Sequence, residues 1–101
     1  MNTQQDIINF LTANQSYIQQ HYHISKMGLF GSFAKGQQTH DSDVDILIEI
    51  KKGTKNIHEI KKDLARFLAH SFGRSVDIAR EKYLKPYARD AILNDTIYIY
   101  E

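Results

Sequence analysis

Strict alternation of residue types between Asp43 and Ile50 constrains the fold more than any other feature of the sequence. In this segment, DVDILIEI, every even-numbered position is Val or Ile, whereas the odd-numbered positions include both aspartates. Successive side chains of a strand point to opposite faces of the sheet. The segment therefore predicts a strand with one apolar face, and its other face carries Asp43 and Asp45 side by side.

The size and composition of the chain predict a single domain. Its 101 residues are 42% hydrophobic, which is enough for one compact core, so we expect one domain over residues 1–101. The absence of cysteine excludes disulfides and thiolate metal sites. No segment approaches the ~20 apolar residues of a membrane-spanning helix, and the first ten residues do not resemble a secretion signal. We therefore expect a cytoplasmic protein without membrane contact.

Charge is distributed unevenly along the chain, although the formal net charge is only +1. Residues 1–50 hold two Lys or Arg against five Asp or Glu, and residues 51–101 hold eleven against seven. A basic segment can attract phosphates, nucleic acid or an acidic partner, but it more often forms a solvated surface. We interpret the basic half as solvated surface.

The hydrophobic periodicity predicts the order helix, strand, strand, helix, strand, helix, strand. The expected segments are a helix over 4–20, strands over 25–30 and 43–50, a helix from 57 that ends at Gly73, a strand over 74–79, a helix over 86–93 and a strand over 96–100. A short helix is also expected directly after Gly31. This order predicts an α/β or α+β fold, with helices on a small mixed sheet of about four strands.

Asp43 and Asp45 are spaced to bind divalent cations. Hard cations such as Mg²⁺ prefer oxygen ligands, and a pair of them can hold both the attacking and the leaving oxygen of a phosphoryl transfer. Asp77 lies on the polar face of the strand expected over 74–79, so it is the candidate for a third carboxylate ligand. Asp77 is also a candidate to accept the proton of an acceptor hydroxyl.

Gly31 and Ser32 form a candidate phosphate-binding turn, which ten residues separate from Asp43. Because Gly31 has no Cβ, a phosphate can approach its backbone closely, and Ser32 offers an amide and a hydroxyl at the start of the short helix. Lys35 can reach a phosphate as a point charge. The gap allows one helical turn and a loop, and therefore brings the phosphate and metal positions together.

The spacing of the Gly-Ser pair and the Asp-Val-Asp triplet resembles the signature of the nucleotidyltransferases that share the DNA polymerase β palm. Within that superfamily the chain is similar to the minimal nucleotidyltransferases. The resemblance covers nearly the whole chain, including residues 76–101, which are similar to the third-carboxylate strand, the following helix and the closing strand of the family. Many members carry arginine two and four residues after the glycine, where this chain has Phe33 and Lys35.

The resemblance implies an antitoxin that acts as an enzyme, by Mg²⁺-dependent transfer of AMP from ATP to a tyrosine of a HEPN-type ribonuclease toxin. The partners that it implies are ATP and this toxin protein, and contact with RNA is not expected. The site residues that it implies are Asp43, Asp45 and Asp77 for catalysis and for two Mg²⁺ ions, and Gly31, Ser32 and Lys35 for the nucleotide.

Two other functions stay open at the level of the sequence. The chain can be a non-catalytic antitoxin that neutralises its toxin by binding alone, or a nucleotidyltransferase that acts on a small hydroxylated molecule such as an aminoglycoside. The pair His21 and His23 does not favour a metal site, since it falls where the first helix is expected to end and where cationic side chains are stabilised by the helix dipole.

Overall fold

Four strands form one mixed sheet in the computed structural model, which describes residues 1–101. The strands are β1 (Ile24–Phe30), β2 (Val44–Ile50), β3 (Val76–Arg80) and β4 (Ile97–Tyr100). Their order in the sheet is β3-β2-β1-β4, with β1 antiparallel to both β2 and β4, and β2 parallel to β3. The expected small mixed sheet of about four strands is confirmed.

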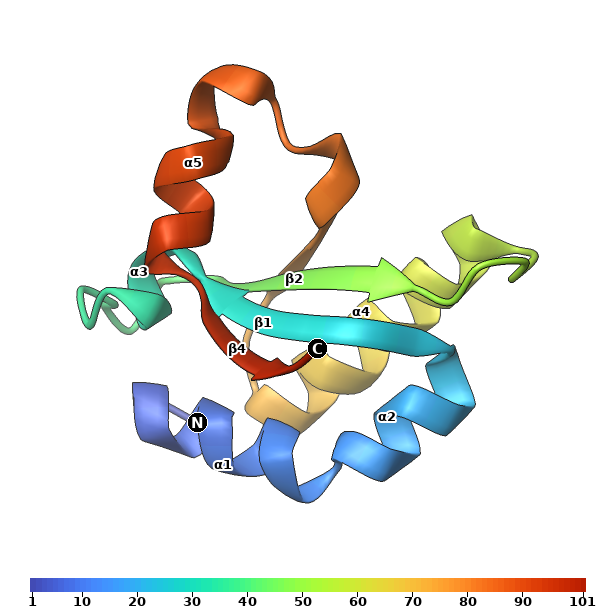
Figure 1. Ribbon diagram of the computed structural model, residues 1–101. Coiled ribbons are helices and arrows are strands. Elements are labelled where there is room, and N and C mark those ends of the chain that lie inside the picture. The colour runs from blue at the N-terminus through green and yellow to red at the C-terminus, as the bar shows by residue number, and fades with distance from the viewer.

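Helices cover the two faces of the sheet unequally. They are α1 (Gln4–Ala13), α2 (Gln15–Tyr22), α3 (Gly31–Ala34), α4 (Ile57–Phe72) and α5 (Pro86–Asp95), with a 3-10 turn η1 (Glu81–Tyr83). Figure 1 shows α1, α2 and α4 on one side of the sheet, and α5 with η1 on the other. None of the helices is long and apolar enough to cross a membrane.

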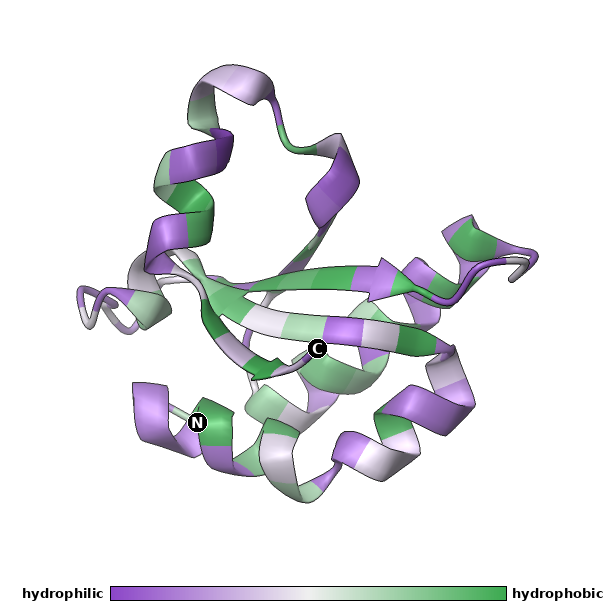
Figure 2. Cartoon of the chain, viewed as in Figure 1, coloured by the Kyte–Doolittle hydropathy of each residue, from purple (hydrophilic) through white to green (hydrophobic).

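The hydrophobic core lies between the sheet and the helices α1, α2 and α4. The alternation in β2 directs its even-numbered residues into this core. Figure 2 shows the strands as mostly hydrophobic, whereas the helices carry alternating hydrophobic and hydrophilic bands. Burial of each large apolar side chain stabilises the fold by about 1.5–3 kcal/mol. The even-numbered residues of β2 therefore face the core, and the aspartates are left on the opposite face of the sheet.

The prediction of one helix over 4–20 is wrong, because the helix is interrupted at Asn14. The Asn14 backbone has φ −104° and ψ 13°, and its side-chain amide donates a hydrogen bond to the Phe10 carbonyl at 2.8 Å. Asn side chains compete in this way with helical backbone hydrogen bonds. Both resulting helices still bury their apolar residues, so the predicted amphipathic pattern is present on two shorter helices.

α4 and α5 differ in how they are attached to the sheet. α4 buries Leu64, Leu68 and Phe72, whereas α5 has no buried residue. A polar contact ties α5 to η1, since the Arg89 guanidinium donates to the Glu81 carbonyl at 2.7 Å. The face of the sheet beneath α5 is therefore covered by a weakly packed helix.

Candidate active site

Gly31 places the end of β1 directly against an aspartate of β2. Gly31 has a φ of +71°, and a Cβ built on it would collide with Oδ2 of Asp45. In the antiparallel pairing of β1 and β2, Asp45 stands opposite Phe30, the residue before Gly31. The predicted phosphate-binding turn and the second predicted metal ligand are therefore adjacent.

The parallel pairing of β2 and β3 brings Asp77 beside Asp45. The two residues are register partners, and neighbouring strands lie about 4.8 Å apart. Asp43 precedes β2 by one residue, at the point where the Val44 amide donates to the Ser75 carbonyl at 2.9 Å. Asp43 and Asp77 are exposed, whereas Asp45 is half-buried. The structure thus brings the three predicted aspartates to one end of the sheet.

The surroundings of Asp45 disfavour its ionised form. Burial raises the pKa of Asp45 from its ordinary 3.8 to about 6, with further contributions from the negative charges of Asp77 and then Asp43. A half-buried carboxylate that two others repel is poorly stabilised by the protein itself. The site therefore favours a bound cation or a proton at Asp45.

The three carboxylates suit a hard cation by their chemistry, although they do not yet form a coordination shell. No group of three or more His, Cys, Asp or Glu side chains in the chain is arranged to hold a metal ion. The donor set consists of oxygens alone, as Mg²⁺ prefers, and a cation would relieve the repulsion at Asp45. Binding would have to draw the exposed Asp43 and Asp77 carboxylates toward Asp45, so their role as ligands stays a prediction.

Ser32 and Lys35 follow the Gly31 turn, Ser32 within α3 and Lys35 directly after it. Ser32 is half-buried in α3, and its hydroxyl makes no hydrogen bond within the chain. Lys35 is directed toward α5, where its Nζ lies 3.8 Å from Oδ2 of Asp95. A cavity of about 210 Å³ separates α3 from α5, with Gly31 and Lys35 on one wall. Lys35 would have to leave Asp95 to reach a phosphate, which costs little for an exposed pair.

Arg74 holds the loop before Asp43, a role that the sequence analysis missed. Its Nη1 donates to the Ser42 carbonyl at 2.7 Å and to the Thr39 carbonyl at 3.3 Å. Its guanidinium also lies 5.0 Å from the centre of the Phe33 ring. No sequence signal identifies these contacts, because a single Arg before a strand does not show which distant carbonyls it reaches.

A second polar cluster, also missed, lies at the other end of the same sheet face. Glu49 accepts hydrogen bonds from Nε and Nη2 of Arg80 at 3.2 and 3.1 Å. Glu81 forms an ion pair with Lys26 at 2.9 Å and accepts a hydrogen bond from the Tyr98 hydroxyl at 3.4 Å. Alternation places Glu49 on the face of Asp45, but its partner is 31 residues away and depends on the strand register.

Comparison with known proteins identifies the family of this chain. The model of the nucleotidyltransferase domain family matches residues 10–99. A relative named protein adenylyltransferase MntA, from Thermococcus cleftensis, is 28% identical over 99 residues, which are 98% of each chain. A solved structure assigned as a minimal nucleotidyltransferase has a TM-score of 0.70 and 27% identity, covering 89% of this chain and 93% of the other.

Two solved toxin–antitoxin complexes share the fold. One, solved with AMP-PNP, has a TM-score of 0.69 and 20% identity, covering 88% of this chain and 72% of the other. The second is the tri-AMPylated HEPN toxin of Shewanella oneidensis with its MNT antitoxin, with a TM-score of 0.62 and 16% identity, covering 92% and 71%.

The matches define a class of protein and then a narrower group. The chain belongs to the nucleotidyltransferase domain family and has the polymerase-β-like fold of that family. Within it, the chain is a minimal nucleotidyltransferase, as the resemblance of nearly its whole sequence implied.

Proposed function

We propose that this chain transfers AMP from ATP to a tyrosine hydroxyl of a partner HEPN-type toxin, and that it acts in this way as an antitoxin. The observation that carries the proposal is the contact of Asp45 with the Gly31 turn on one side and its pairing with Asp77 on the other. The family match and the adenylyltransferase relative support the reaction. The AMPylated HEPN toxin bound to a protein of this fold supports the acceptor.

Nucleotide binding starts at the Gly31 turn. Gly31 has no side chain, and the Asp45 carboxylate fills the space that a Cβ would occupy. The turn therefore holds this carboxylate close to Ser32, whose amide and hydroxyl would donate hydrogen bonds to a phosphate. Lys35, on the same wall as Gly31, adds a positive charge once it leaves Asp95. The triphosphate is thereby held beside Asp45.

Asp43, Asp45 and Asp77 would hold Mg²⁺. When bound, this ion neutralises the triphosphate and the charge that develops on its leaving oxygens. Burial raises the pKa of Asp45 to about 6, so its ionised carboxylate is poorly stabilised when no cation is bound. We therefore expect transfer to require a divalent cation, and a chelator to stop it.

Asp77 accepts the proton of the acceptor hydroxyl. The hydroxyl oxygen then forms a bond to the α-phosphorus of ATP, the bond from that phosphorus to the bridging oxygen breaks, and pyrophosphate leaves. Asp77 is exposed at its end of the sheet, so an acceptor on another protein can reach it. A need for ATP and the lack of cysteine agree with a cytoplasmic location.

The test uses labelled ATP, Mg²⁺ and the candidate toxin as acceptor. We expect the double variant Asp43→Asn/Asp45→Asn to reduce labelling by about 1,000-fold or more, because several kcal/mol of transition-state stabilisation depend on the cation. Asp41→Asn is the matched control, since the Asp41 side chain is 84% exposed in the same loop and its carboxylate pairs only with His40. Its labelling should equal that of the parent.

A cell-growth assay separates chemistry from binding. If the toxin is neutralised by AMP transfer, the double variant fails to protect cells from it, whereas Asp41→Asn protects them fully. Full protection by the double variant would contradict the proposal and would favour an antitoxin that acts by binding alone.

A further inference from the structure

The largest cavity of the chain lies at the opposite end of the β1–β2 pair from the three aspartates. Its volume is about 580 Å³. The end of α2, the turn between β2 and α4, and the first turn of α4 form its walls. Its polar lining includes Lys51, Lys52, Lys55, His21 and His23, and no acidic side chain lines it. The cavity therefore concentrates positive charge in a chain whose formal net charge is only +1.

The three lysines of this cavity have no counter-charge within the chain. None of them forms an ion pair, whereas Lys26 and Lys35 elsewhere in the chain each contact a carboxylate. All three are exposed and fall within five successive residues, 51–55. Like charges at this spacing repel one another, and an anion in the cavity would remove that repulsion.

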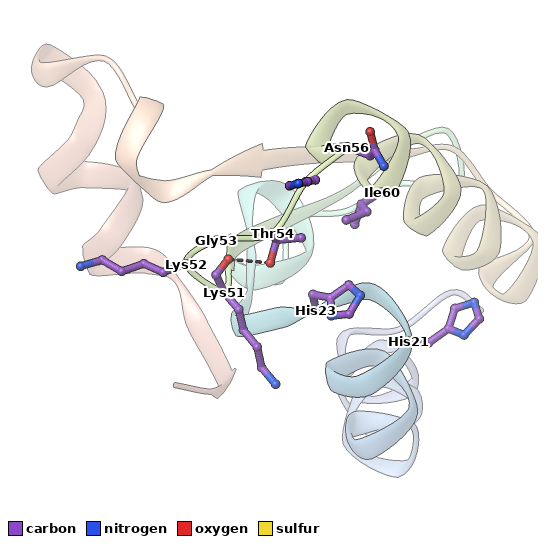
Figure 3. A pocket seen from close by; sticks show the side chains of 9 residues that line it. His21, His23, Lys51, Lys52, Gly53, Thr54, Asn56 and Ile60 are labelled. Atoms are coloured by element: carbon purple, nitrogen blue, oxygen red, sulfur yellow. Dashed lines mark hydrogen bonds between the residues drawn. The ribbon is translucent and has the colours of Figure 1, made fainter.

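The turn that carries the lysines is fixed to the end of the sheet. The Lys51 amide donates to the His23 carbonyl at 2.9 Å, and the Thr54 hydroxyl donates to the Lys51 carbonyl at 2.6 Å. Figure 3 shows this second bond, with the Lys51 and Lys52 side chains extending to different sides of the turn. The backbone of the cavity is thus defined, while the lysine side chains are free to close over a ligand.

We propose that this cavity binds an oligophosphate, meaning two or more linked phosphoryl groups, either free or as the tail of a nucleoside polyphosphate. Lysine is a flexible point charge that suits phosphate oxygens. The volume lies within the ~300–1,000 Å³ range of small-molecule sites. This site is separate from the aspartate site and does not depend on AMP transfer.

The lining favours a small anion over a macromolecule. Protein partners are anchored by buried aromatic and apolar groups, but Ile60 is the one apolar residue in this lining. Single-stranded nucleic acids stack on aromatic side chains, and no Phe, Tyr or Trp lines the cavity. The main property of this cavity is its positive charge, which linked phosphates, with several negative charges close together, would neutralise best.

The test is an NMR titration of the ¹⁵N-labelled full chain with sodium tripolyphosphate in EDTA. EDTA removes the divalent cations on which triphosphate binding beside the three aspartates is proposed to depend. We expect saturable shifts of the Gly53 and Thr54 amides, which sodium sulfate at equal ionic strength does not reproduce. The same shifts in the Asp43→Asn/Asp45→Asn variant would separate this site from the proposed catalytic function.

Paired lysine variants locate the binding. Lys51→Ala/Lys55→Ala should weaken binding about tenfold or more, which corresponds to at least about 1.4 kcal/mol, because two positive charges of the lining are removed. Lys61→Ala/Lys62→Ala is the matched control, because it removes the same charge from α4 outside the lining. It should change the dissociation constant by less than about twofold. Equal losses in the two variants would overturn the proposal, because they would show attraction to net charge alone.

Other ligands define the chemistry further. ATP and tripolyphosphate binding alike, with AMP failing to bind, would support the proposal with a nucleotide tail as ligand. Binding of tripolyphosphate alone would support it with a free oligophosphate. An RNA oligonucleotide or an acidic peptide that shifts Gly53 and Thr54, and that tripolyphosphate does not displace, would overturn it.

Discussion

At the α3 end of the β1–β2 pair two of the three aspartates, Asp45 and Asp77, lie on strands, whereas at the other end the lysines of residues 51–55 lie on the turn between β2 and α4. Asp45 and Asp77 are fixed by strand register, and Asp45 packs against Gly31. Lys51 and Lys52 instead project from a turn into solvent. The acidic end therefore keeps its charges together against their repulsion, and the basic end leaves its charges free to move.

This difference shows what each end can do. A phosphoryl-transfer site needs ligands held within a fraction of an ångström, which strands provide and turns do not. A site that only attracts an anion gains most from flexible point charges. The predictions that follow test whether the rigid end depends on its packing as strongly as the structure implies.

Among variants that keep all three aspartates, the largest effect is expected for Gly31→Ala. A Cβ there would collide with the Asp45 carboxylate, and the φ of +71° adds strain of about 1–2 kcal/mol for any other residue. Displacement of Asp45 should reduce AMP transfer about 100-fold. Initial rates with labelled ATP measure this loss, and thermal unfolding measures the strain.

Gly53→Ala at the basic end is the matched control for Gly31→Ala. Gly53 has a φ of +80°, but nothing lies within 4 Å of the position of its Cβ. The control should show a similar loss of stability with no loss of transfer. If both variants lost transfer equally, backbone strain and not the contact with Asp45 would be responsible, and the two ends would not differ as described.

Arg74→Ala is expected to have the next largest effect. It removes hydrogen bonds to the Ser42 and Thr39 carbonyls and the contact with the Phe33 ring, and should lower the free energy of unfolding by about 2–3 kcal/mol. Urea unfolding measures this change. Arg66→Ala is the control, because Arg66 is 71% exposed and pairs only with Asp63, so its effect should stay within about 0.5 kcal/mol.

Asp45 should give the metal-free protein a stability that falls as pH rises. Its folded-state pKa is raised from 3.8 to about 6, so the folded chain binds this proton more tightly than the unfolded chain does. The free energy of unfolding should therefore decrease between about pH 4 and pH 6, by about 1–2 kcal/mol after allowance for solvent screening.

Asp45→Asn is the variant that checks this pH dependence. It should abolish the decrease and make the chain more stable than the parent at pH 7 while transfer is lost. Urea unfolding in EDTA over this pH range gives the comparison. A variant that is less stable than the parent at pH 7, or that keeps the same slope, would contradict the electrostatic account.

Much of the fold was predictable because the strongest signals are local. The alternation in residues 43–50 gives β2, its buried face and the common face of the aspartates, and the apolar spacing over 57–72 gives α4. The single turn after Gly31 was also expected. The interruption at Asn14 was not expected. One long helix and two shorter helices can have the same apolar pattern, and the break here involves a hydrogen bond from the Asn14 side chain that the pattern does not reveal.

The proximity of the candidate site residues was predictable, but their supports were not. The motif spacing predicted that Gly31 and Asp45 are close, the polar face of its strand made Asp77 the third candidate, and the strand register brings the three together. Arg74 was interpreted as solvated surface, yet it reaches carbonyls 32 and 35 residues away. Such contacts depend on how the elements pack, which no local pattern encodes.

The absence of buried residues in α5 has a consequence for access to the site. Local opening costs least where little apolar surface is buried, so α5 should exchange its amide hydrogens before α4 or the sheet does. α5 forms one wall of the cavity beside Gly31. We therefore expect α5, which covers the proposed nucleotide-binding turn, to open before the rest of the fold. Its opening would leave intact the strands that hold Asp45 and Asp77.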